Sequence, residues 1–237
     1  LREATEFTLT AGADVCQMEY ERCYEDRYGN KPLTQLNGSY AIPLTATLPD
    51  GTCVLISEAD LNASYCGSMV TSTGDGVLHL AFEPKQTEPV VAAAPFRSPW
   101  RVMVIGSPAT VAETQIFENL CPPCQIADTS WIQPGVSSWT WFNGDPTDDP
   151  EVYKQYIDLA ASMGWQYVLL DEGWQPRAED YEGRKSYAGI SAWVPDVISY
   201  ASAKGIGIVV WSTWWDLDTP QKRERLREWA SLGIKGV

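Results

Sequence analysis

The sequence has little of several features that mark familiar classes of protein. It holds one histidine, His79, and 17 Lys and Arg residues against 31 Asp and Glu residues, for a net charge of -14. Nucleic acids and anionic membranes bind through basic patches, so this balance argues against both as partners. No apolar run reaches the roughly 18 residues of a membrane helix, so no membrane span is predicted. No G-x-G-x-x-G motif follows a predicted strand, which makes a dinucleotide site a poor interpretation.

The six cysteines lack the pattern of a zinc site. Cys121 and Cys124 have the spacing of metal ligands, but no second pair lies at zinc-finger distance and the lone His79 cannot complete such a site. An even number of cysteines permits disulfides in an oxidising compartment. Buried or paired cysteines are therefore the favoured interpretation, and their pairing stays open.

The first half of the chain is typical of an all-β domain. Alternating apolar and polar residues predict strands over 39–48, 53–58, 77–82 and 101–105. Gly-containing turn signals separate these strands. Many short strands with such turns favour a β-sandwich, so residues 1–130 are predicted to form a partial sandwich domain. His79 falls on one of these strands, where a packed or solvent-facing side chain is the simpler interpretation.

The second half, residues 131–237, alternates strands and helices. Helices are predicted from Pro150 to Gly164, from Val194 to Gly205 and from Thr219 to Gly233, and strands at 167–170, 206–211 and from Ile234. This alternation implies a parallel sheet, whether open or closed into a (β/α)₈ barrel. A complete barrel needs about 250 residues, so this half would supply three βα units of one.

Acidic and aromatic residues gather where the predicted parallel strands end. Asp171 and Glu172 follow the strand at 167–170, and Trp174 comes directly after them. Trp141 and Trp211 follow the neighbouring strands. In barrels this end of the strands carries the chemistry. Carboxylates can accept hydroxyl hydrogen bonds and indoles can stack on sugar rings, so these five residues are the candidate substrate-binding set, although such aromatics also fill cores.

Several ordered motifs resemble glycoside hydrolase family 97. Residues Ser130–Gly135, Trp139–Trp141 and Tyr156–Trp165, leading into Asp171–Trp174, resemble the beginning of its catalytic barrel. Residues Pro99–Val102 and Asn119–Leu120 resemble its N-terminal domain. The resemblance implies α/β plus all-β architecture: an N-terminal β super-sandwich segment followed by the first three βα units of a (β/α)₈ barrel.

The resemblance also implies an activity. Members are exo-acting α-glucosidases and α-galactosidases supported by calcium, and Glu58 resembles the sandwich-domain carboxylate that binds this ion. The substrate would be an oligosaccharide, and the location periplasmic or secreted. The family's general acid and its base or nucleophile are expected beyond Val237, so no catalytic pair is assigned. A non-catalytic carbohydrate-binding or structural remnant, and an α-galactosidase of another barrel family, remain the alternatives.

Overall fold

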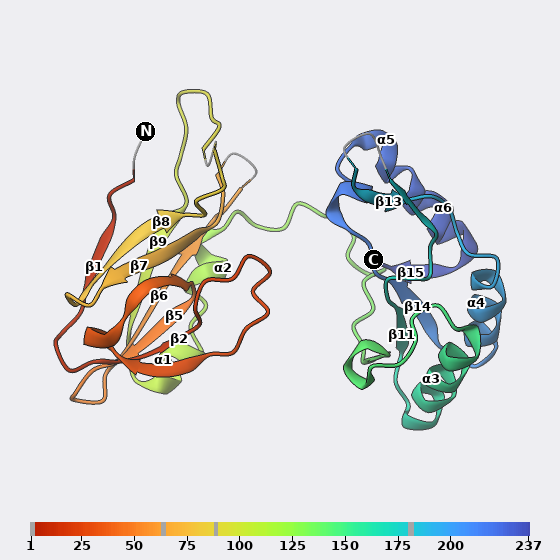
Figure 1. Cartoon of the computed structure of the whole chain (residues 1–237), viewed down its shortest axis with the longest axis horizontal. Coiled ribbons are helices and arrows are strands. Elements are labelled where there is room, and N and C mark those ends of the chain that lie inside the picture. Colours follow the sequence, from red (N-terminus) through yellow and green to blue (C-terminus); the bar gives the residue numbers. More distant parts are fainter. Residues whose placement is uncertain (1–2, 63–64, 88–89, 180–182) are drawn as a thin grey trace. The chain divides into compact units, whose positions relative to one another are not determined.

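The chain folds into two compact units, each with its own core. The computed structural model describes residues 3–62, 65–87, 90–179 and 183–237. Contacts within the chain divide it into Leu1–Ala127 and Asp128–Val237, and Figure 1 shows the first as mainly strands and the second as strands with helices. In the described part of the chain, no helix has both the length and the apolar character needed to span a membrane.

The first unit contains two antiparallel sheets. One has four strands in the order β1-β8-β7-β4 and the other has five in the order β3-β2-β5-β6-β9. The strands are β1 (Glu6–Thr8), β2 (Asp14–Gln17), β3 (Gly29–Pro32), β4 (Asn37–Ala41), β5 (Leu44–Thr47), β6 (Cys53–Ala59), β7 (Ser68–Thr73), β8 (Val77–Phe82) and β9 (Trp100–Gly106). Three short helices accompany them: η1 (Leu33–Gln35), α1 (Pro108–Ala112) and α2 (Ile116–Leu120).

Both sheets contribute to one hydrophobic core, as in a sandwich. Tyr40 and Val70 come from the four-stranded sheet, and Val15 and Ile56 from the five-stranded one, and all are 2% exposed or less. The strand neighbours of Val15 and Ile56 are more exposed because successive side chains of a strand point to opposite faces. The sandwich-like arrangement predicted for this region is therefore present.

The predicted strands of this unit are mostly confirmed. β6, β8 and β9 cover the predicted strands at 53–58, 77–82 and 101–105. The single strand predicted over 39–48 is wrong, because the chain turns at Ile42-Pro43 and continues as β5 in the other sheet. Pro43 has no N–H for a strand ladder, so it marks the break.

The second unit is built around a parallel sheet in the order β10-β11-β14-β15. Its strands are β10 (Ser137–Trp139), β11 (Tyr167–Leu170), β14 (Gly207–Val210) and β15 (Ile234–Gly236). The helices are η2 (Trp141–Asn143), α3 (Pro150–Met163), α4 (Val194–Ala203), η3 (Trp214–Asp216), α5 (Pro220–Arg223) and α6 (Arg225–Leu232). A hairpin, β12 (Arg177–Glu179) with β13 (Lys185–Tyr187), lies between β11 and α4.

Helices cover one face of this sheet. Val168, Leu170, Ile208 and Val210 are at most 1% exposed and pack with apolar residues of α3, α4 and α6. The alternate residues of β11 and β14 are only partly buried. The sheet therefore has a covered face and a more open one, and both β11 and β14 end on the same edge.

Local capping chemistry explains where these helices lie. Asp149 caps α3 by accepting a hydrogen bond from Glu151 N, and Gly164 ends it in the left-handed conformation, as predicted. The helix predicted from Thr219 to Gly233 begins and ends where expected, with the Thr219 side chain as its cap. It is interrupted at Glu224, so it consists of α5 and α6.

Candidate functional site

Asp171 is a buried carboxylate at the end of β11. It is 6% exposed, and each of its oxygens accepts a hydrogen bond from a nitrogen. The Trp139 indole Nε1 donates to Oδ2 at 2.7 Å, and the backbone N–H of Glu172 donates to Oδ1 at 2.7 Å. A carboxylate offers about four lone-pair sites, so this one keeps room for further donors. Its position is fixed before any ligand arrives.

The backbone of Asp171 is fixed as well. Its N–H donates to the hydroxyl of Tyr153 on α3 at 3.2 Å, and that hydroxyl donates to the carbonyl of Thr147 at 2.9 Å. Burial raises the pKa of Tyr153 to about 12, so the hydroxyl stays neutral and keeps both roles. The helix covering the sheet thus holds the strand end in place.

Trp139, rather than the predicted Trp141, contacts the candidate site residue Asp171. In the parallel register Trp139 lies opposite Leu169, two residues before Asp171, so the three side chains share one face of the sheet. Trp141 follows in η2 and is 64% exposed, and its indole makes no hydrogen bond within the described part of the chain. The strand register, which puts Trp139 on the Asp171 face, was the signal that could have identified it.

Trp174, predicted as part of the substrate-binding set, is not accessible to a substrate in this structure. Its indole is fully buried in the core, with its ring centroid 5.2 Å from that of Trp229 on α6. The cause is the turn at Gly173, whose φ of +121° returns the chain toward the core. Only glycine fits there, because a Cβ would lie 2.8 Å from the carbonyl oxygen of Thr147. From the core, the Trp174 indole Nε1–H donates a hydrogen bond to the backbone carbonyl of Trp211 at 2.7 Å and so holds the end of β14.

Trp211 and Glu172 lie around one arginine, Arg177 of β12. The Arg177 guanidinium carbon is 5.5 Å from the centre of the Trp211 ring, within the range of a cation–π contact. Its Nε lies 3.8 Å from Glu172 Oε1. The Glu172 side chain is 59% exposed and Trp211 is half-buried, so both remain accessible. The structure therefore brings these two predicted residues together through Arg177, which no sequence pattern marked as a candidate.

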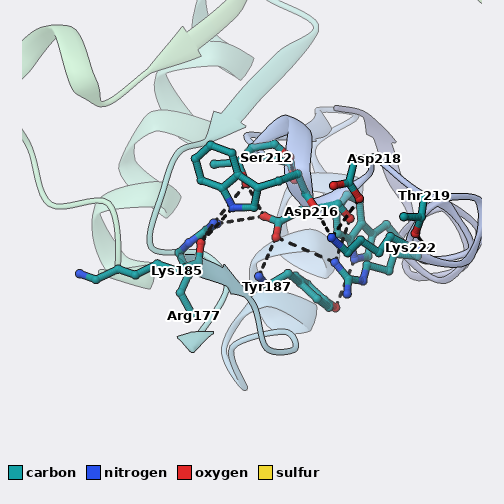
Figure 2. Close-up of polar contacts among 12 residues, drawn as sticks. Arg177, Lys185, Tyr187, Ser212, Asp216, Asp218, Thr219 and Lys222 are labelled. Atoms are coloured by element: carbon teal, nitrogen blue, oxygen red, sulfur yellow. Dashed lines mark hydrogen bonds and ion pairs between the residues drawn. The ribbon is translucent and has the colours of Figure 1, made fainter. Parts of the chain in front are cut away.

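Asp216, at the end of η3, is a fully buried carboxylate that the sequence analysis also missed (Figure 2). Its Oδ2 accepts from Arg177 Nη1 at 3.1 Å and from Thr213 Oγ1 at 2.8 Å. Its Oδ1 accepts from the backbone N–H of Tyr187 at 2.8 Å and lies 4.0 Å from Arg225 Nη1. The loops after β11 and β14 are thereby joined. An acidic residue inside the aromatic run 211–216 was the one available sequence signal.

Glu58 lies in the first unit, where it belongs to a group of charged side chains. Its Oε1 accepts from Ser68 N at 3.0 Å and its Oε2 from Ser68 Oγ at 2.6 Å, and Arg101 donates to Oε2 as well. Arg101 is in turn held by Glu3 through two contacts of 2.7 Å. Arg101 therefore pairs with two carboxylates, Glu3 and Glu58, and Glu58 also lines a surface cavity of about 710 Å³.

The Glu58 carboxylate could therefore serve as one calcium ligand, but one carboxylate does not form a calcium site by itself. Calcium takes roughly 6–8 oxygen ligands, and a supported carboxylate is a common one. In the described part of the chain no three His, Cys, Asp or Glu side chains gather closely enough to hold a metal ion. Asp60 lines the same cavity, as do Cys121 and Cys124, and all six cysteines are free thiols in the structure.

Comparisons with known proteins agree across both units. The family model for the glycosyl-hydrolase 97 N-terminal region matches residues 1–123, and that for glycoside hydrolase 97 matches residues 131–237. A probable retaining alpha-galactosidase of Streptomyces bingchenggensis is 34% identical over 100% of this chain and 38% of its own length. A retaining alpha-galactosidase of Bacteroides thetaiotaomicron is 28% identical over 92% of this chain and 37% of its own length.

Solved structures share the fold of the chain. A beta-arabinopyranosidase superposes with a TM-score of 0.77 at 21% identity, over 97% of this chain and 40% of its own. A glycoside hydrolase family 97 enzyme of Pseudoalteromonas sp. strain K8, bound to acarbose, gives 0.71 at 24% identity, over 87% of this chain and 34% of its own. This chain thus spans less than two fifths of the length of the curated relatives described above.

Proposed function

Because this chain belongs to glycoside hydrolase family 97, we propose that it is part of an exo-acting glycosidase that removes terminal α-galactosyl or α-glucosyl residues from oligosaccharides. The observation that carries the proposal is the fixed, buried carboxylate of Asp171 at the carboxyl end of β11. Two further candidate substrate residues lie just beyond strand ends, Trp211 after β14 and Glu172 after β11. We favour the galactosyl substrate because both curated relatives are named alpha-galactosidases.

The parallel sheet supports completion as a (β/α)₈ barrel in the whole protein. Helices cover one face, and the opposite face is partly open, as it would be in a barrel that further strands close. The carboxyl ends of the strands would then surround one mouth. Asp171 would bind sugar hydroxyls with its remaining lone pairs, and Trp211 would offer the exposed part of its ring to the sugar.

Bond cleavage needs two carboxyl groups, about 5–5.5 Å apart for retention and about 6.5–9.5 Å for inversion. Asp171 and Glu172 are adjacent in sequence and differently placed, one buried between two nitrogen donors and one 59% exposed at its side chain. We assign them to substrate binding and support. The acid and the nucleophile or base are proposed to lie beyond Val237.

Calcium is proposed for the whole protein, with Glu58 as the ligand from this chain. The support is its fixed, hydrogen-bonded setting beside Ser68 and Arg101, at the edge of the surface cavity. A bound calcium ion would supply positive charge to a site whose surroundings are acidic. The remaining oxygen ligands would come from residues outside the group described around Glu58.

Hydrolysis by the complete protein tests the proposal. Nitrophenyl α-galactoside and nitrophenyl α-glucoside would be compared, and the anomer released would be identified by NMR. Turnover of either substrate is expected, faster for the galactoside, with retained configuration. Sugar binding without turnover would instead favour a carbohydrate-binding protein, and neither binding nor turnover would remove the proposed function.

A further inference from the structure

We propose that Arg177 is a positioning residue that holds Trp211 and Glu172 in place for the sugar, and that Asp216 holds Arg177. This inference rests on the proposed function of the strand ends as a sugar site. It concerns two residues, on the β12 hairpin and in η3, that lie 39 positions apart in the sequence and meet beside the site (Figure 2).

Arg177 is held in one orientation from several sides. Its Nη1 donates to Asp216 Oδ2, and its Nη2 donates to Thr213 Oγ1 at 3.2 Å and to the Lys185 carbonyl. The Arg177 side chain is 8% exposed and that of Asp216 is not exposed at all. A buried carboxylate without a cation is strongly unfavourable, so Asp216 fixes where the guanidinium must lie.

The fixed guanidinium in turn restrains two predicted substrate residues. Its central carbon lies over the Trp211 ring, 5.5 Å from the ring centroid, and the half-buried ring keeps exposed surface for a ligand. Its Nε faces the Glu172 carboxylate at 3.8 Å, an attraction that orients an otherwise exposed side chain. The Trp211 backbone is already fixed by Trp174, so Arg177 sets the remaining freedom of the ring. A side chain ordered in advance binds more tightly because less conformational entropy is lost on binding.

A lysine could not do the same. An ammonium group is a compact charge without a plane, whereas a guanidinium can stack on an indole and donate to several acceptors at once. The Arg177 side chain uses both properties, through Trp211 on one side and through Asp216, Thr213 and the Lys185 carbonyl on the other. Arg177→Lys should therefore keep the ion pair with Asp216 but lose the restraint on the ring.

Arg225 provides a matched control. It also lies beside Asp216, with Nη1 4.0 Å from Oδ1, and it stacks over Tyr187 at 4.7 Å. No contact of Arg225 with Trp211 or Glu172 is found in the described part of the chain. Arg225→Met and Arg177→Met therefore each remove one cation near Asp216, and only the second releases the proposed substrate residues.

The experiment uses the complete protein, with nitrophenyl α-galactoside for kinetics and galactose for calorimetric binding. Arg177→Met is expected to raise KM and the galactose Kd by on the order of tenfold, with a smaller change in kcat, and Arg177→Lys by less. Arg225→Met should change KM within twofold. In a Trp211→Ala background, Arg177→Met should have a smaller effect, because the ring is gone and only Glu172 remains for Arg177 to orient. Melting curves accompany every variant.

Each outcome decides the matter. Equal effects of Arg177→Met and Arg225→Met, or an undiminished effect of Arg177→Met without Trp211, would make the network purely structural and overturn the inference. If Arg177→Met does not fold, Arg177→Lys carries the comparison, and a KM equal to that of the wild type overturns it. A wild-type protein that neither hydrolyses the galactoside and glucoside nor binds galactose would refute the proposed function itself.

Discussion

Asp171→Asn should affect stability and activity for separable reasons. Both carboxylate oxygens accept from N–H groups, one from Trp139 and one from Glu172. An asparagine has one acceptor oxygen and one NH₂ group, so in either orientation a donor faces a donor. A buried polar group left unsatisfied costs about 1–3 kcal/mol, and we expect the free energy of unfolding to fall by that amount.

Trp139→Phe supplies the control for this expectation. Phenylalanine removes the N–H opposite Oδ2, so in that background the asparagine can turn its NH₂ toward the ring and keep its oxygen for Glu172 N. The destabilisation by Asp171→Asn should then shrink by about 1 kcal/mol or more, measured by urea unfolding followed by near-ultraviolet circular dichroism. Equal losses in the two backgrounds would refute the hydrogen-bonding argument.

The catalytic effect should not be rescued in the same way. If Asp171 binds sugar hydroxyls, its lost charge lowers kcat/KM on the galactoside by on the order of 100-fold, about 2.7 kcal/mol, in either background. Steady-state kinetics of the single and double variants in the complete protein measure this. A loss within a few fold, or one that disappears with Trp139→Phe, would make Asp171 a structural residue only.

Three further predictions concern other parts of the chain. Glu58→Gln in the complete protein should weaken calcium binding and lower activity, whereas Glu3→Gln, which also removes a carboxylate from Arg101 but lies outside the Glu58 cavity, should weaken calcium binding less in a calorimetric titration. The hydrogen bond from Arg101 holds the pKa of Glu3 below its ordinary value of 4.5, so this contribution to stability is present above that pH and is lost as the pH falls through the lowered pKa. Acid unfolding curves should therefore be shallower below pH 4.5 for Glu3→Gln than for the wild type. Gly173→Ala should destabilise the second unit by more than about 1 kcal/mol, because of its φ of +121° and the 2.8 Å approach to Thr147 O, whereas Gly51→Ala, with a φ of +86° but open space around it, should cost less in the same unfolding assay.

Periodicity and capping predicted most of the second unit because its elements obey local rules. Asp149, Pro150 and Gly164 define α3 through chemistry within a few residues, and the apolar run at 167–170 has the length of a buried strand. The same rules failed at Pro43, where one alternating run serves two sheets. A change of sheet depends on which partners the strand finds, and the sequence pattern does not contain that information.

The candidate site could be reached only in part from the sequence, for a similar reason. Asp171 was a candidate because a carboxylate at the end of a buried strand is unusual in itself. Trp174 was misplaced because the direction of the turn at Gly173 is set by contact with Thr147, which lies 26 positions earlier. Arg177 and Asp216 were missed because each is an ordinary loop residue until the fold brings them to 3.1 Å.

The uneven distribution of indoles between the two units gives the molecule a built-in optical label. Trp100 is the one tryptophan of the first unit, and it is 47% exposed. All the others lie in the second unit, where Trp174 and Trp229 form a buried edge-to-face pair. When water reaches a buried indole, the wavelength and the intensity of its fluorescence emission both change. The emission of an indole that is already exposed changes little. Fluorescence therefore follows the second unit almost alone, while amide absorption follows both, and a difference between the two signals would reveal independent melting of the sandwich.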